Sequence, residues 1–283
     1  MTLQVLVVSY RRADLLAALL ADLSRLHPDW PVHVWDNFSD RSAEVGALAA
    51  KHPEVRWTFS PDNVGFAAGV NRLVEAAPQS ADVLLLNPDA RLLAPLTPLV
   101  QALYADPRAG AVAPLTHSKR QASWDVAHRR PRLVSSLVEY AGYAARMRRW
   151  AWSGRYPQPP QRCDWASGSC LLVRRTAWED VGPFDEQFWL YGEEVDWSLR
   201  AQKRGWHVRL VAEELVGHDA GATVGDDTTQ SERSADLLRT SQTLLLRRWS
   251  GAPAATAFTV ATAVIDRVQP AKRRQRADRA GAR

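Results

Sequence analysis

The side chains best suited to chemistry in this 283-residue chain are concentrated at residues 184–196. This segment holds five carboxylates among aromatic side chains, and Glu193, Glu194 and Asp196 directly follow a glycine. Carboxylates gathered this closely repel one another, and a proton, a cation or a hydroxyl substrate offsets the repulsion. Acidic residues in a first helical turn also complement the helix dipole, and Asp196 can pair with Arg200 one turn later. These residues alone are therefore compatible with a reactive site and with an ordinary helix start.

A second candidate group follows the apolar run at residues 83–86, where Asn87, Pro88 and Asp89 stand at the exit of a predicted strand. A carboxylate at this point can bind a hard cation such as Mg²⁺, although Asn-Pro-Asp also occurs as simple turn chemistry. One carboxylate rarely holds Mg²⁺ without help, so a further protein ligand is expected. A lone loop histidine such as His218 is by itself more often a surface or hydrogen-bonding residue.

Two further segments carry polar residues where apolar runs end. Asp36 follows the run at residues 32–35, and it can accept from a base N–H or a ribose hydroxyl, or form a turn that caps the next helix. Residues 62–71 combine a loop with a small-residue helix start, where backbone N–H groups can approach a phosphate or a sugar. Gly65 and Gly69 lack the three-glycine spacing of a dinucleotide fingerprint, which argues against a dehydrogenase.

The elements that position these residues alternate in type over the first 115 residues. Short β-branched runs followed by helical patterns predict right-handed βαβ units and a mostly parallel sheet. Ligands of such sheets bind beyond the carboxyl ends of the strands, so Ser9, Asp36, Asn63 and residues 87–89 are expected at one rim. The predicted strands are 3–9, 32–35, 55–59, 83–86 and 111–113, and the predicted helices are 15–26, 43–50, 66–77 and 96–104.

Residues 116–162 interrupt this alternation with an apolar stripe at helical spacing and clustered arginines, which predicts a helical insert. The α/β pattern then resumes with a strand at 165–173, an acidic helix at 193–204 and a strand at 207–211. The tail has no apolar residue larger than alanine, so we expect it to be disordered. The predicted parts are a catalytic domain at 1–230, a helical appendage at 231–269 and the basic tail at 270–283.

The positive charge is confined to two segments. Residues 270–283 hold six basic residues and one acidic residue, which equals the whole net charge of +5, and residues 119–162 hold ten basic and two acidic residues. This confinement argues against nucleic acid as a partner and favours contact with phosphates or an anionic membrane. Arginines 146, 148 and 149 beside Trp150 and Trp152 suit a lipid interface.

Cysteine usage and hydropathy favour a cytoplasmic protein with peripheral contact on the inner face of the membrane. Cys163 and Cys170 cannot build a disulfide framework, and no Cys/His spacing is typical of a zinc site. The chain starts with an apolar strand instead of a signal peptide pattern. The weakly polar run at 251–265 is too short for a transmembrane helix.

The segment at 182–200 resembles the acceptor-side motif of family 2 glycosyltransferases, which are inverting sugar-nucleotide enzymes of the GT-A fold, and particularly their rhamnosyltransferase-like branch. Four further segments, 5–11, 35–40, 63–71 and 84–89, fit the same family in the same order. The resemblance covers residues 3–223. It implies an α/β fold with a Rossmann-like, mostly parallel nucleotide-binding sheet flanked by helices, with a helical insert and C-terminal helices.

The resemblance also implies roles for the reactive residues. Glu194 stands where the family has its catalytic Asp, and because Glu is longer by one methylene, Glu193 and Asp196 remain alternatives as the base. Asp89 matches the second Asp of the family's Asp-any-Asp motif, which binds Mg²⁺ or Mn²⁺ under the diphosphate, whereas Asn87 replaces the first. His218 matches the family's late histidine near the metal, and an imidazole ligand would favour Mn²⁺.

The remaining implied residues bind the two substrates. The donor nucleotide is expected to contact Ser9, Tyr10, Arg11, Asp36, Asn63, Gly65, Asn71, Asn87 and Asp89. The acceptor pocket is expected to include Gly168, Ser169, Asp185 and Trp189, with Ser167-Gly168-Ser169 in place of the family's usual Thr-Gly-Ala.

The implied reaction passes a sugar from dTDP-L-rhamnose or a UDP-hexose to a hydroxyl of a saccharide or lipid-linked saccharide, with inversion, in cell-surface polysaccharide or glycolipid synthesis. Two alternatives stay open. A catalytically inactive nucleotide-sugar-binding protein fits the departures at Asn87 and Glu194. A membrane-surface scaffold would use only the two basic segments.

Overall fold

The computed structural model separates the chain into two compact units. Unit 1 comprises Met1–Arg129 and Tyr156–Gly225, and unit 2 comprises Arg130–Arg155 and Asp226–Arg283. The arginine and tryptophan cluster predicted at residues 146–152 lies outside the part of the chain that the structure describes. The described residues are 2–38, 42–117, 126–144, 156, 158–218 and 228–281.

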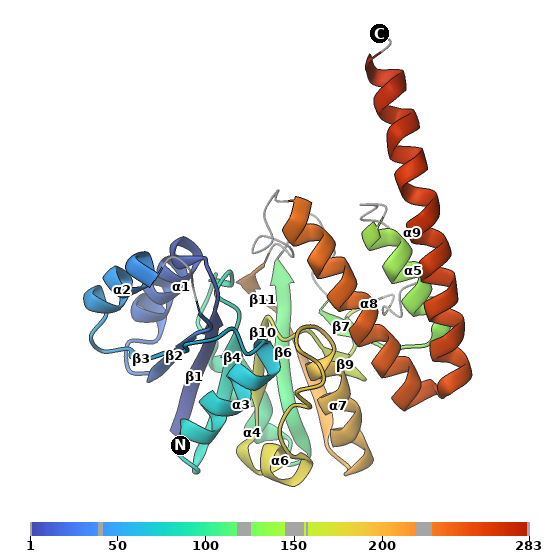
Figure 1. The fold of residues 1–283 in the computed structure, drawn as a ribbon. Helices are drawn as coiled ribbons and strands as arrows, with labels where there is room; N and C mark the ends of the chain where they lie inside the picture. Colours follow the sequence, from blue (N-terminus) through green and yellow to red (C-terminus); the bar gives the residue numbers. More distant parts are fainter. Residues whose placement is uncertain are drawn as a thin grey trace. The chain divides into compact units, whose positions relative to one another are not determined.

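Within the described residues, unit 1 is built on a nine-stranded sheet of order β3-β2-β1-β4-β10-β6-β11-β5, with β8 paired to β11 (Figure 1). The strands β1, β2, β3 and β4 are parallel, as are β6 and β11, whereas β10 runs antiparallel between β4 and β6. The predicted mostly parallel α/β fold is confirmed. The strands are β1 (Thr2–Ser9), β2 (Val32–Asp36), β3 (Arg56–Phe59), β4 (Ala81–Leu86), β5 (Arg91–Leu92), β6 (Ala109–His117), β8 (Arg162–Cys163), β10 (Cys170–Val173) and β11 (His207–Gly217).

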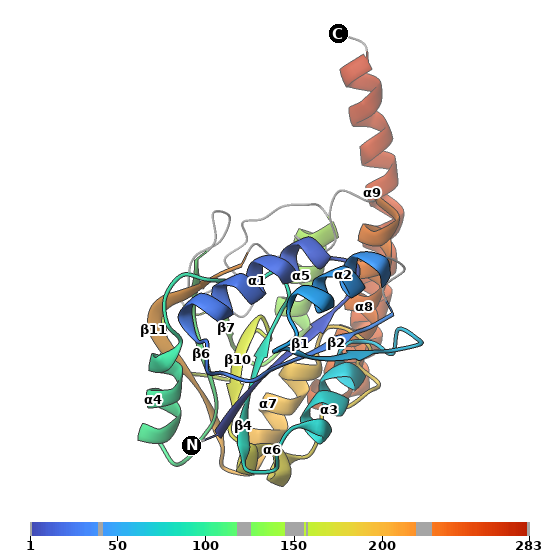
Figure 2. The same cartoon turned by 90° about the vertical axis from the view of Figure 1, so that its left-hand side faces the viewer.

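Helices cover both faces of this sheet, and the central strands are accordingly mainly apolar (Figures 1 and 2). Alternate residues of β1 enter opposite cores, with Val5 and Val7 in one and Leu6 and Val8 in the other. The core around Leu6 also takes side chains from α3, α6 and α7, and the core around Val5 takes them from α1 and α4. The helices of unit 1 are α1 (Ala13–Leu26), α2 (Ser42–Lys51), α3 (Phe66–Ala76), α4 (Thr97–Ala105), α6 (Arg175–Val181) and α7 (Glu193–Lys203).

The strand register brings the polar strand ends to one edge. Ser9 pairs with Asp36, Asp36 pairs with Phe59, and Leu86 pairs with Val7 two residues before the end of β1. This edge is the rim that the sequence predicted for the candidate residues.

The strand predicted at 165–173 is divided into two. Trp165–Ala166 form β9, which pairs with β7 (Ala127–His128), and Cys170–Val173 form β10 in the main sheet. Residues 167–169 make a turn between them, because a glycine flanked by two serines favours a change of direction over a continuous strand. The turn is held in place by the Ser169 N–H, which donates to Ser167 Oγ at 3.3 Å.

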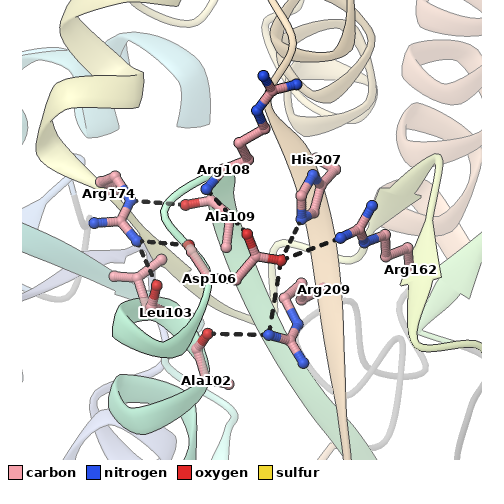
Figure 3. Close-up of polar contacts among 9 residues, drawn as sticks. All are labelled: Ala102, Leu103, Asp106, Arg108, Ala109, Arg162, Arg174, His207 and Arg209. Carbon is pink, nitrogen blue, oxygen red and sulfur yellow. Dashed lines mark hydrogen bonds and ion pairs between the residues drawn. The ribbon is translucent and has the colours of Figure 1, made fainter.

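At the opposite edge of the sheet, Asp106 joins four chain segments (Figure 3). Its Oδ2 atom lies 2.8 Å from His207 Nε2, 3.3 Å from Arg162 Nη2 and 3.8 Å from Arg209 Nη1. Its Oδ1 atom accepts from the backbone N–H of Arg108 at 3.0 Å. One carboxylate thus links the end of α4 to the starts of β6 and β11 and to β8.

Arg174 supports the same corner from another side (Figure 3). Its guanidinium donates to the carbonyl oxygens of Leu103, Asp106 and Ala109. Carbonyls at a helix C-terminus lack intrahelical partners, so this arginine satisfies the end of α4.

Unit 2 is helical and is made of α5 (Leu133–Ala144), α8 (Thr228–Ser250) and α9 (Ala252–Gly281). Tyr140 and Phe258 are buried and meet edge to face at 5.9 Å, and the Tyr140 hydroxyl donates to Asp266 at 2.9 Å. Part of the predicted insert groups with the C-terminal helices, and α9 runs from Ala252 to Gly281. No helix among the described residues has the length and apolar character needed to cross a membrane.

Candidate functional site

The ends of β1 and β2 bring together four of the predicted donor-side residues. Ser9 is buried beside Asp36, and its Oγ atom has no hydrogen-bond partner among the described residues. Tyr10 is half-buried, and Arg11, which has a φ of 61°, places its guanidinium 5.0 Å from the centre of the Tyr10 ring. A buried hydroxyl and a buried carboxylate at the rim are groups that can recognise a polar ligand.

Asn37 fixes the neighbouring loop, although the sequence analysis did not single it out. Its Oδ1 atom accepts from the backbone N–H of Val64 at 3.0 Å, and its Nδ2 atom donates to Asn63 Oδ1 at 2.9 Å and to Gly65 O at 3.1 Å. Asn63 Oδ1 also accepts from the Gly65 N–H, so this predicted donor residue holds its own loop. The sequence did contain a signal for this role, because Asn37 directly follows the strand end at Asp36 and a buried amide side chain needs several hydrogen-bond partners.

The same loop contacts the acidic segment through Gly65. Its φ is 86°, and a Cβ atom placed on it would lie 2.5 Å from the carbonyl oxygen of Trp189. That carbonyl accepts from the backbone N–H of Phe66 at 2.8 Å. Glycine is required here for both reasons, and the contact brings a predicted donor residue against a predicted acceptor residue.

Asn71 holds the beginning of the acidic segment. Its Nδ2 atom donates to Phe184 O and to Glu186 Oε1, and its Oδ1 atom accepts from the Phe184 N–H, each at 3.0 Å. Asp185 in turn accepts from the backbone N–H of Gln187 at 2.9 Å. These contacts give Asn71 and Asp185 positioning roles in the structure as it stands.

The acidic helix α7 begins with two carboxyl groups that interact with each other. Glu193 is 4% exposed and Glu194 is half-buried, and their carboxyl groups lie close enough to affect the pKa of each other. Burial raises the pKa of both groups, and the charge of Glu194 raises that of Glu193 further. Glu194 also accepts from backbone N–H groups, including that of Gly168, which lower its pKa and offset part of the rise.

Asp196 has a different environment from the two glutamates. It is fully buried, and its Oδ2 atom accepts from Arg200 Nε at 2.8 Å. Arg200 also donates to the carbonyls of Val181 and Pro183. The pairing with Arg200 one turn later is therefore present, and it ties α7 to the end of α6.

Asp89 and His218 lie together at the end of the sheet. Asp89 is 7% exposed, and its Oδ1 atom is 3.3 Å from Nε2 of His218. Arg12, which was not among the predicted site residues, pairs with Asp14 at 2.8 Å. The pKa of Arg12 is raised by Asp14 and also by the charge of Asp89.

The pair formed by Asp89 and His218 fits a divalent cation in part. Neighbouring ligands about 2.1 Å from one ion lie about 3 Å apart, close to the observed separation of the two side chains. No cluster of three or more His, Cys, Asp or Glu side chains suited to a metal ion occurs within the described ranges. The residues present suit an ion that takes its other oxygens from substrate phosphates and water.

The turn at residues 167–169 connects these groups. Ser169 O accepts from the backbone N–H of Asn87 at 3.0 Å, and the Gly168 N–H donates to Glu194. Asn87 belongs to the same short segment as Asp89. The turn thus contacts both Glu194 and the short segment that carries Asp89.

The sequence of the chain matches a known family and a curated relative. The sequence profile of the glycosyltransferase-like family 2 matches residues 2–250. The chain is 32% identical over 243 residues to an N-acetylglucosaminyl-diphospho-decaprenol L-rhamnosyltransferase of Mycobacterium tuberculosis, and the match covers 79% of this chain and 78% of the relative.

Two solved structures share the fold at low sequence identity. They are S. aureus TarS, with a TM-score of 0.53 and 12% identity over 88% of this chain, and GalNAc-T7 with UDP, GalNAc and Mn²⁺, with a TM-score of 0.59 and 16% identity over 77%. The chain spans 43% and 44% of those two proteins. The matched profile and the 32% identical relative show that the chain belongs to the glycosyltransferase-like family 2.

Proposed function

We propose that this chain transfers a sugar from a nucleotide-diphosphate donor to a hydroxyl group of a lipid-linked saccharide, with inversion at the transferred sugar. The supporting observation is the turn at 167–169, because it holds Glu194 and the Asn87–Asp89 segment on one structural unit. The name of the mycobacterial relative supports dTDP-L-rhamnose as the first donor to test and a lipid diphosphate saccharide as the acceptor. A UDP-hexose is the second donor class.

Glu194 is the proposed general base. It is more exposed than Glu193, and Asp196 is fully buried in its ion pair with Arg200. Burial raises the pKa of Glu194 above its ordinary value, and a base is most effective when its pKa lies close to the working pH. Glu194 takes the acceptor hydroxyl proton while the oxygen bonds to the anomeric carbon and the bond from that carbon to the diphosphate oxygen breaks.

The donor is proposed to bind along the rim. Asp36 and Ser9 would hold the nucleoside, and Arg12 would add positive charge near the diphosphate. Asp89 and His218 would hold Mn²⁺ or Mg²⁺, and the bound ion would supply charge that stabilises the departing diphosphate. Trp189, Gly168 and Ser169 would line the acceptor side.

A lipid-linked acceptor would place the enzyme at a membrane, in cell-surface polysaccharide or glycolipid synthesis. We propose peripheral contact of the basic segments with anionic lipid on the cytoplasmic face, with roughly 1 kcal/mol contributed by each basic residue near the surface. Flotation with anionic and neutral liposomes at low and high salt tests this contact. Equal recovery with both lipids would exclude an electrostatic attachment.

The proposed reaction is tested by incubating the purified protein with dTDP-L-rhamnose or UDP-hexoses, Mn²⁺ and a polyprenyl-diphosphate saccharide. We expect a glycosylated lipid whose new linkage has the anomeric configuration opposite to that of the donor. Glu194→Gln should bind donor normally and turn over about 10² to 10⁴-fold more slowly. A product with retained configuration, or full turnover by Glu194→Gln, would contradict the proposed mechanism.

A further inference from the structure

The pair of carboxyl groups at the start of α7 poses a hydrogen-bonding problem. Glu193 and Glu194 are within hydrogen-bonding contact, and Oε2 of each is buried without a hydrogen-bond partner in the described part of the chain. Two ionised carboxylates can only accept, so they cannot bond to each other. A single proton on the pair turns one member into a donor and gives the other a partner.

The surroundings decide which residue keeps this proton. Glu193 is 4% exposed, whereas Glu194 is half-buried and accepts backbone N–H bonds that stabilise its negative charge. Burial disfavours the charged form more strongly at the deeper position. Asp196 lies in the same turn, and its charge is compensated by Arg200 at 2.8 Å. Arg200 therefore pairs with Asp196 and not with the two glutamates.

We propose that Glu193 carries a proton at neutral pH and donates the hydrogen bond that positions the Glu194 carboxylate as the base. This inference rests on the proposed function of Glu194 and assigns Glu193 a positioning role. The bond keeps Glu194 ionised, because a donor stabilises the carboxylate that accepts from it.

The number of protons on the two carboxyl groups is the same before and after one turnover. Glu193 keeps its proton throughout, and Glu194 receives the proton of the acceptor hydroxyl as the glycosidic bond forms and the donor bond breaks. Both carboxyl groups are then neutral. Glu194 then releases its proton to water and returns to the accepting state.

Two substitutions of similar size separate donation from packing. Glu193→Gln can donate through its amide but cannot ionise, and Glu193→Met has similar length and cannot donate. The pH dependence of kcat/KM would be measured for the wild type, both variants and the control Glu75→Gln, which changes an exposed residue of α3. Infrared spectra at neutral pH would independently report protonated carboxyl groups without any turnover.

We expect Glu193→Gln to retain most of its activity with an acidic limb close to that of the wild type. Glu193→Met should move that limb to higher pH by about one unit, a loss of about tenfold at pH values below it. The infrared band of a buried protonated carboxyl group should be present in the wild type and in Glu75→Gln, and absent from Glu193→Gln.

Three results would overturn the proposal. Equal pH profiles of kcat/KM for the Gln and Met variants would mean that Glu193 acts only through packing. An acidic limb that moves to lower pH in Glu193→Gln would show that Glu193 is ionised in the wild type. Loss of turnover in Glu193→Gln with full turnover in Glu194→Gln would make Glu193 the base. Full turnover in Glu194→Gln with an intact infrared band would contradict the role of Glu194 alone.

Discussion

At the residue scale, Asp89 gives the sharpest test of the donor site. The carboxylate is buried beside His218, and its negative charge raises the pKa of Arg12. We expect Asp89→Ala to remove the Mn²⁺-dependent part of donor binding, because His218 alone cannot hold the ion. Calorimetric titration of the nucleotide sugar with and without Mn²⁺ measures this, with Asp29→Ala at an exposed turn position as the control. Unchanged affinity and metal dependence in Asp89→Ala would remove it from the metal site.

Residues that can react or bind a ligand were easier to predict than the residues that position them. The sequence placed Ser9, Asp36 and Asp89 at strand ends, and the register brings those ends to one edge. It did not reveal Asn37 or Arg12, since the partners of Asn37 lie about 26 residues away in the chain and Arg12 is identified only by its proximity to Asp89. Such roles depend on tertiary contacts that no local pattern encodes.

At the element scale, the loop at residues 63–65 connects the donor side to the acidic segment, and Gly65→Ala tests that connection. Its backbone conformation costs of order 1–3 kcal/mol for a residue with a side chain, and the new methyl group would overlap Trp189 O. We expect a lower melting temperature and faster hydrogen exchange in the segment containing Trp189. The matched control is Gly46→Ala in exposed α2, which meets no atom within 4 Å and should stabilise the helix by about 0.5–1 kcal/mol. Equal melting temperatures for the two variants would rule out the strained contact.

Helices and strands with a clear hydrophobic pattern were predicted well, whereas a turn that divides a predicted strand was not. The apolar runs of β1 and β4 are buried on both faces and read as strands without ambiguity. The turn at 167–169 divides a continuous predicted strand, because β9 pairs with β7 while β10 enters the main sheet. Strand partners are set by distant segments, so the sequence alone did not show that the turn at 167–169 contacts both Glu194 and Asn87.

At the scale of the whole molecule, the site lies at one edge of the sheet and Asp106 secures the other (Figure 3). Burial alone would raise the pKa of Asp106, but hydrogen bonds from His207 and the Arg108 backbone and the charge of Arg162 lower it overall. A carboxyl whose pKa is lower in the folded state stabilises the fold above its unfolded pKa, and this contribution disappears as pH falls through the folded value. The stabilisation from Asp106 is therefore complete at neutral pH and is lost in acid, below about pH 4.

The contribution of the Asp106 charge to stability can be measured by comparing the melting temperatures of the wild type and Asp106→Asn at several pH values. The variant keeps the shape of the side chain but loses the charge that faces His207, Arg162 and Arg209, so we expect a lower melting temperature than wild type at pH 7. The difference should shrink as pH falls below about 4, because protonation removes the same charge from the wild type. Asp29→Asn, at an exposed turn position, is the control and should show no such convergence. A melting-temperature difference that stays constant from neutral to acidic pH would mean that Asp106 acts through its shape and not its charge.

Donor affinity should be equal in wild type and Asp106→Asn under folded conditions, since the carboxylate lies at the edge opposite the rim that holds Ser9 and Asp36.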